Sequence, residues 1–196
     1  MSTTGAFGFR IEGQDKVAFH GSDAHPSGLG TRFLTLFNEV GYYLMNNLAK
    51  GIVLVDSERY YDELHFPFSR FEKQARGLVE IADGREHLLK PQIEWAYIMN
   101  FDEGVFETYS GLNGIRVKNA RGRYSSLFMP ETPHIPGVRL IHEMFLLNVN
   151  GESIRDYASD IDKITGGMIN ESEFKGMSFY EIDKIWKQRY AAEQAK

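Results

Sequence analysis

Two strand-like segments, of which the first is largely apolar, open the chain around a turn and predict a β-hairpin. Residues 4–11 predict a first strand, residues 16–20 predict a return strand, and Gly13-Gln14-Asp15 predicts the turn between them. Residues 20–30 are rich in Gly, Ser, Asp and Pro, which is typical of a loop. The opening of the chain therefore predicts two paired strands followed by an irregular segment.

A helical pattern follows this loop. In residues 31–50 the apolar side chains recur at the spacing of an amphipathic helix that packs on a sheet. Gly51 follows the last lysine of the segment and is a helix stop signal. Residues 52–55 then predict a short strand. The apolar positions of the expected helix are Phe33, Leu34, Leu36, Phe37, Val40, Tyr43, Leu44 and Leu48.

The middle of the chain carries the strongest hairpin pattern. Residues 94–101 and 105–109 are aromatic and β-branched, and Asp102-Glu103-Gly104 predicts the turn between them. Residues 138–149 form an apolar run that fits either a buried helix or a buried strand. The weaker expectations are strands at 115–117 and 124–128 and partly helical structure over 56–76.

The order of the elements indicates the fold class. Ser178 and Glu181 have the spacing of a capping box and predict a helix over residues 178–196. Strands thus come first, then a helix, then hairpins, then helices. This order is typical of an α+β fold with a largely antiparallel sheet rather than of alternating βαβ units. We expect residues 1–196 to form a single globular domain.

Composition narrows the function classes. Of the 196 residues, 42% are hydrophobic and 13% are aromatic, which suits a packed globular protein. The net charge of -5 argues against binding of nucleic acid through phosphate contacts. The chain has no cysteine, which excludes disulfides, a thiol nucleophile and cysteine ligands to zinc. No signal peptide and no apolar run of about 20 residues is visible, so we expect a cytoplasmic protein that neither spans a membrane nor requires a cofactor.

The first residues carry the main chemical hypothesis. Ser2, Thr3 and Thr4 lie next to the amino terminus and lead directly into the expected first strand. A hydroxyl beside a terminal amine is one way to build a nucleophile, because the amine serves as general base. Asp23 follows the expected second strand and lies in the loop described above. The same hydroxyl residues also suit the plain start of a strand, so both interpretations stay open.

The opening resembles that of uncharacterised phage and bacterial proteins that begin Thr-x-Gly-x-x-Gly-Phe. In those proteins a short hairpin is followed by a loop of the type Tyr-Asn-His-x-Asp-Ser-Tyr-Pro-x-x-Leu-Gly. The loop of this chain departs from that type, because His20, Gly21 and His25 stand where Asn, His and Tyr would be expected. The matching residues are Thr3, Gly5, Gly8, Phe9, Asp23, Pro26, Leu29 and Gly30, together with the later stretch Glu94-Trp95-Ala96-Tyr97.

More distantly, the opening is similar to proteasome β subunits and other N-terminal nucleophile hydrolases. This resemblance implies an αββα arrangement, in which two antiparallel sheets are sandwiched between helices, and an amide or peptide substrate. It also implies Ser2 or Thr3 as nucleophile, the free α-amine as general base and Asp23 as its support. Removal of Met1 would free Ser2, whereas Thr3 would need a further cut. The other candidates for a supporting role are His20, His25 and Lys50.

Two other chemistries fit the same loop. His20, Asp23 and His25 could bind a divalent metal and leave a position open for water, as in a metal hydrolase. Gly21 and Ser22 could equally form a tight turn that the Asp23 side chain caps. Gly28-x-Gly30 precedes the expected helix and could bind an anion through its N–H groups, or serve only to start the helix.

A non-catalytic function is the alternative of a different class. A phage or bacterial protein of this kind could bind a protein partner in host interaction or assembly, through an exposed apolar or basic patch. Assembly into a homo-oligomer fits both functions, since proteasome-like sandwiches often assemble through their helices. His142 and Glu143 lie inside an apolar run and predict either a pair with shifted pKa values or hydrogen-bonded structural residues.

Overall fold

The structure, a computed structural model, describes residues 3–55, 68, 71, 80–82, 88, 93–111 and 139–164. Within these residues a five-stranded sheet has the strand order β2-β1-β5-β6-β7, and a parallel pair of short strands forms a second sheet. The strands of the larger sheet are β1 (Gly5–Ile11), β2 (Gln14–His20), β5 (Trp95–Asn100), β6 (Val105–Ser110) and β7 (Arg139–Phe145). The short pair is β3 (Val53–Val55) and β4 (Glu80–Ala82).

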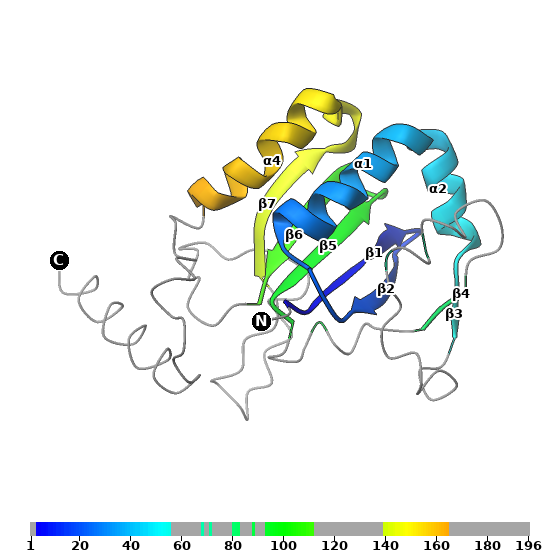
Figure 1. Cartoon of the computed structure of the whole chain (residues 1–196). Helices are drawn as coiled ribbons and strands as arrows, with labels where there is room; N and C mark the ends of the chain where they lie inside the picture. Colours follow the sequence, from blue (N-terminus) through cyan, green and yellow to red (C-terminus); the bar gives the residue numbers. More distant parts are fainter. Residues whose placement is uncertain are drawn as a thin grey trace, which may run out of the picture.

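Helices cover one face of the larger sheet. Figure 1 shows α1 and α4 side by side over this face, with α2 continuing from α1 toward the β1–β2 side. None of the helices in the described ranges is long and apolar enough to cross a membrane. This part of the chain is therefore mixed α+β, as the sequence predicts. The helices are α1 (Thr31–Val40), α2 (Tyr42–Gly51) and α4 (Gly151–Ile164), with the π-helical turn η1 (Pro26–Gly30) before α1 and the 3-10 turn η4 (Leu146–Asn148) after β7.

The larger sheet is mixed rather than purely antiparallel. β1 and β5 pair in parallel, with Phe7 opposite Tyr97, whereas the other three neighbouring pairs are antiparallel. The sequence prediction of a largely antiparallel sheet thus holds for most pairs, and the parallel pair joins segments far apart in the chain. The apolar run at 138–149, which fits a helix or a strand, contains β7 and then η4.

Both faces of the larger sheet are buried at β1, β5 and β6. Phe7 and Phe106 point toward α1, where their ring centroids lie 5.7 and 6.0 Å from that of Phe33. Ala6 and Ile98 lie on the opposite face and have no exposed surface. Because side chains of successive strand residues point to opposite faces, near-continuous apolar strands such as β1 and β5 are expected in a sheet that is covered on both sides.

The single helix predicted over residues 31–50 is wrong, since the segment forms α1 and α2. Gly41 separates them with a φ of 83°, a left-handed conformation that favours glycine. Its N–H still donates to the Phe37 carbonyl at 2.8 Å, as within a helix, but its own backbone conformation is not helical and ends α1. The apolar periodicity on both sides of Gly41 is helical, and periodicity alone does not reveal a break between two consecutive helices.

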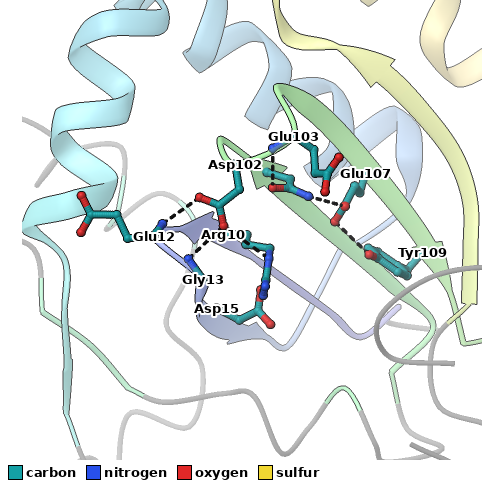
Figure 2. A network of polar contacts seen from close by, with 9 residues as sticks. Arg10, Glu12, Gly13, Asp15, Asp102, Glu103, Glu107 and Tyr109 are labelled. Atoms are coloured by element: carbon teal, nitrogen blue, oxygen red, sulfur yellow. Dashed lines mark hydrogen bonds and ion pairs between the residues drawn. The ribbon is translucent and has the colours of Figure 1, made fainter. Parts of the chain in front are cut away.

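Two turns are joined at one end of the sheet. The β1–β2 turn consists of Glu12 and Gly13, which have φ values of 52° and 75°, and it lies one residue earlier than the sequence predicts. The Asp102 carboxylate, from the β5–β6 turn, accepts the N–H groups of Glu12 and Gly13 at 2.8 and 3.0 Å. The Arg10 guanidinium lies 3.5 Å from the same carboxylate (Figure 2). Asp102 therefore fixes the position of one hairpin relative to the other.

A buried carboxylate lies beside these turns. Glu107 of β6 is 3% exposed. One of its oxygens accepts the side-chain amide of Asn100 and the other accepts the Tyr109 hydroxyl, both at 2.8 Å (Figure 2). Since each oxygen has a donor, these contacts give Glu107 the hydrogen bonding that a buried polar group requires.

Lys16 of β2 binds the carboxyl end of α2. Its ammonium donates to the carbonyl oxygens of Ala49, Lys50 and Ile52 at 3.0, 2.8 and 2.8 Å. Carbonyl groups at the end of a helix have no partner within the helix, and a cation is favourable there. Lys16 thus attaches α2 to the edge of the sheet.

We expect Lys16→Met to lower the free energy of unfolding by about 2 kcal/mol, because three carbonyl groups lose a charged donor. Urea unfolding would measure the loss. Lys50→Met is the matched control, since the Lys50 ammonium is half exposed and lies 3.0 Å from Glu12, and an exposed ion pair contributes at most about 1 kcal/mol. Equal losses for the two variants would contradict the role given to Lys16.

Several sequence predictions lie outside the described residues. They concern the strands at 115–117 and 124–128 and the helix over 178–196. In the segment 56–76 the structure describes residues 68 and 71, and both are helical.

Candidate functional site

Thr3 and Asp23 lie at the same end of the sheet. Thr3 precedes β1, and Asp23 follows β2. The N–H of Ala24 donates to the Thr3 carbonyl at 3.2 Å, and the β1–β2 register places Gly5 opposite His20. The start of β1 is therefore adjacent to the loop that carries the acidic candidate. The Thr3 residue itself is 5% exposed.

The loop conformation presents Asp23 at the surface. Asp23 is exposed and has a φ of 54°, a left-handed conformation that Asp tolerates better than most residues. A Cβ built on Gly28 would lie 3.0 Å from the Asp23 Oδ1, so the carboxylate lies close to the Gly28 backbone. The loop thus folds back on itself, with Asp23 at its outer side.

Buried tyrosines hold this loop from the sheet side. The Tyr97 hydroxyl donates to the Ala24 carbonyl at 2.7 Å. A Cβ built on Gly30 would lie 2.9 Å from ring carbons of both Tyr97 and Tyr157, so the chain at Gly30 lies directly against the two rings. Burial raises the pKa of the Tyr97 hydroxyl, with Tyr157 and Asp23 adding to the shift, and burial also raises the pKa of Tyr157. Both hydroxyls therefore remain protonated, and that of Tyr97 is the donor to Ala24.

Sequence reasoning missed this anchoring. Tyr97 lies in a predicted strand and in a stretch that carries the family resemblance, but neither indicates its bond to the loop, and Tyr157 lies in α4, which is not among the predicted elements. A signal for α4 was available, because Asn150 accepts the N–H groups of Glu152 and Ser153, as an N-cap residue does. The apolar residues Ile154, Tyr157 and Ile161 also have helical spacing.

His20 is buried and its imidazole is engaged. The Nδ1 atom accepts the N–H of Phe68 at 3.3 Å, and the ring meets Phe7 edge-on at a centroid distance of 6.3 Å. We infer the tautomer from this hydrogen bond: a neutral ring whose Nδ1 accepts carries its proton on Nε2. His20 in this state is a hydrogen-bond donor through Nε2, and Nδ1 cannot take a proton without losing the Phe68 bond.

The loop histidines and Asp23 do not form the metal site considered from the sequence. Among the residues that the structure describes, which include all three, no group of three or more His, Asp or Glu side chains is placed to hold a metal ion. The His25 carbonyl instead accepts the N–H groups of Gly28 and Gly30 at 2.9 and 3.4 Å. These N–H groups, considered for anion binding, are thus used within η1.

The other sequence candidates lie elsewhere or outside the described residues. Lys50 pairs with Glu12, which directly follows β1, whereas Thr3 precedes β1. A strand of seven residues spans about 23 Å, so the structure does not bring Lys50 to Thr3. Met1 and Ser2 are not among the described residues.

Comparison with known proteins assigns no family. No protein-family model matches the chain, and neither the curated proteins nor the solved structures give a match. The residues at the start of β1 and in the loop after β2 are therefore the basis on which a function is inferred.

Proposed function

We propose that the chain is an amide hydrolase of the N-terminal nucleophile type, with Thr3 as nucleophile and Asp23 as support. The observation that carries the proposal is the hydrogen bond from Ala24 to the Thr3 carbonyl, which ties the start of β1 to the residue after Asp23. A nucleophile of this type uses its own amine as base and needs no histidine. That fits a site in which the Nδ1 of His20 is already bonded to Phe68.

In the proposed reaction, removal of Met1 and Ser2 makes Thr3 the first residue. The amine of Thr3 takes the proton of its own hydroxyl while Oγ1 attacks the carbonyl carbon of the substrate. The amine then gives that proton to the leaving nitrogen as the C–N bond breaks. An ester on Oγ1 remains, and water hydrolyses it to the acid and free enzyme. In this proposal Asp23 accepts a hydrogen bond from the amine and orients it.

The αββα arrangement belongs to the same proposal. The five-stranded sheet with α1 and α4 over one face supplies one helix layer and one sheet layer (Figure 1). Burial of the opposite face, where Ala6 and Ile98 have no exposed surface, supports a further layer there. Sheet faces that are this apolar need a packed covering.

The proposal predicts a processed and reactive terminus. Intact-mass measurement and terminal sequencing of untagged protein are expected to find a species that begins at Thr3 with a free amine. Incubation with a β-lactone probe is expected to label this species once, on Thr3 Oγ1, because the adjacent amine activates that hydroxyl. Peptide mapping by mass spectrometry identifies the labelled residue.

Matched variants separate reactivity from general accessibility. Thr3→Ala is expected to abolish labelling, whereas Thr4→Ala is expected to retain it, since only the terminal residue has both hydroxyl and amine. Asp23→Asn is expected to slow labelling about tenfold or more, as loss of one orienting group does in general base catalysis. A protein that keeps Met1, or whose terminus is blocked, would overturn the proposal.

A specific observation favours a second candidate function, binding of a protein partner without catalysis. Large apolar side chains are exposed on α2 and after β7, with Tyr43 at 76% and Leu147 at 85% exposure. Apolar side chains on the surface are common at interaction sites. An unprocessed terminus in the experiment above would make this the leading candidate, in a monomer or a homo-oligomer.

A further inference from the structure

His142 occupies an unusual position between β7 and α4. It lies opposite Thr108 in the β6–β7 register, and its ring meets that of Tyr157 edge-on at a centroid distance of 5.8 Å. The Nδ1 atom is buried and has no hydrogen-bond partner among the described residues. Buried polar atoms are nearly always paired, so each exception requires an explanation.

Tyr157 connects this histidine to the candidate site. Its hydroxyl lies 2.7 Å from the Thr108 Oγ1, and its ring contacts the chain at Gly30, at the end of the loop that carries Asp23. A single α4 side chain thus contacts His142, the sheet and the loop. Displacement of Tyr157 would remove support from the loop on the side of α4.

The charges around His142 come mainly from α4. Burial lowers the pKa of the His142 imidazole, and the Asp160 carboxylate opposes that shift. Asp160 is itself held by Lys163 at a distance of 2.8 Å. On β6 the facing residue is the uncharged Thr108. Glu143 neighbours His142 on its own strand, and Glu107 neighbours Thr108 on β6, but adjacent strand residues point to the other face.

Protonation of His142 shifts the equilibrium between the packed and the opened state in one direction. A protonated imidazole donates from both ring nitrogens, and the described residues provide no acceptor at Nδ1. The packed state, in which the ring is partly buried, therefore favours the neutral ring, whereas an opened state with the ring fully solvated accepts the proton at its ordinary pKa. Acid consequently favours the opened state. As the pH falls, the packed state begins to lose stability near the ordinary histidine pKa of about 6.5, and this loss ends once the pH is below the lowered pKa that His142 has in the packed state.

We propose that His142 is a pH-sensitive switch that, when protonated in mild acid, loosens α4 and the loop that carries Asp23. The mechanical link is Tyr157, which contacts His142 on one side and Gly30 on the other. The opening of α4 and of the loop is inferred from these contacts alone, whereas its effect on hydrolysis rests on the proposed function. Acid would thereby regulate access to the start of β1 or the geometry of the residues there.

Hydrogen exchange followed by mass spectrometry, between pH 5 and 7.5 and corrected for intrinsic exchange rates, tests the switch. Below about pH 6.5 the equilibrium constant for opening of residues 151–164 and 21–30 is expected to increase as the pH falls. Its increase approaches about tenfold per pH unit, which is the limit for one linked proton. His142→Gln, which cannot be protonated, is expected to abolish this dependence in residues 151–164. In residues 21–30 it is expected to leave only the part that a further His20→Gln substitution removes, because protonation of the His20 Nδ1 would break its bond to Phe68. His142→Phe serves as a second neutral variant if the glutamine is poorly accommodated.

Three controls make the outcome decisive. His25→Gln removes the histidine of the loop itself and is expected to leave the pH dependence intact. Asp160→Asn removes the opposing carboxylate and is expected to extend the dependence to lower pH, because the pKa of packed His142 then falls further. Persistence of the dependence in both His142 variants, or its loss in His25→Gln, would overturn the proposal. The Thr3→Ala variant is expected to show the same exchange, so failure of the hydrolase proposal would not affect this test.

Discussion

Replacement of Phe33 by Ala is expected to lower the free energy of unfolding by about 3–5 kcal/mol, the range observed when a buried aromatic ring is truncated. Phe33 of α1 has no exposed surface. Its ring centroid lies 5.4–6.4 Å from five other phenylalanine rings, on β1, β6 and at positions 68 and 71. Truncation would leave a cavity in the layer between α1 and the sheet, where edge-to-face ring contacts add to the burial energy.

Guanidinium unfolding of the purified variants measures this effect. Phe33→Leu is the graded control and is expected to cost less, since it leaves a smaller cavity. Tyr43→Ala removes an aromatic ring that is 76% exposed, and its expected change is within about 0.5 kcal/mol. A Phe33→Ala loss no larger than that of Tyr43→Ala would show that α1 does not pack on the sheet as described.

Local patterns in the sequence predicted most of the elements at the start and middle of the chain. The hairpins β1–β2 and β5–β6 lie where strand-like segments and turn residues place them, because a hairpin is specified by residues close together in the chain. The apolar positions in 31–50 are helical, as predicted, but Tyr43 and Leu44 are 76% and 61% exposed rather than packed on the sheet. The break at Gly41 was missed because a glycine within a periodic segment does not show on its own which backbone conformation it adopts.

Contacts between distant segments could not be predicted. The parallel pairing of β1 with β5 joins residues about ninety positions apart, and no local pattern specifies such a pair. The same holds for Asp102, which binds the backbone of Glu12 and Gly13, and for Lys16, whose ammonium binds the end of α2. Asp102 and Lys16 are charged residues that the sequence alone would place in solvent, and each has a structural partner that only the fold provides.

The candidate site was predicted in part. The sequence placed Thr3 before the first strand and Asp23 after the second, and the antiparallel hairpin necessarily brings these two ends together. Lys50 was considered for the same site, but it lies at the far end of β1, beside Glu12. The anchoring role of Tyr97 and Tyr157 depends on α4 packing over the loop, which is again a long-range arrangement.

Gly8→Ala is expected to cost about 3 kcal/mol or more, at or above the upper end of the usual range for overpacking. A Cβ built on Gly8 would overlap the Lys16 carbonyl oxygen and lie 2.7 Å from the Val17 Cα, both backbone atoms of β2. Backbone in the middle of a paired strand cannot move aside as a flexible side chain can. The methyl group would therefore force β1 and β2 apart, and with them the end of the sheet where Thr3 meets Ala24.

The matched control for this prediction is Gly51→Ala. Gly51 ends α2 and is exposed, and a Cβ there would have no heavy atom within 4 Å. Its expected change is within about 0.5 kcal/mol of neutral or a gain of up to about 1 kcal/mol, because alanine restricts the unfolded chain more than glycine does. Thermal unfolding of the two alanine variants compares one added methyl group in two environments. If both melt with the parent protein, the close approach of β1 and β2 at Gly8 is wrong, whereas a selective loss in Gly8→Ala establishes that this glycine is required by the neighbouring strand.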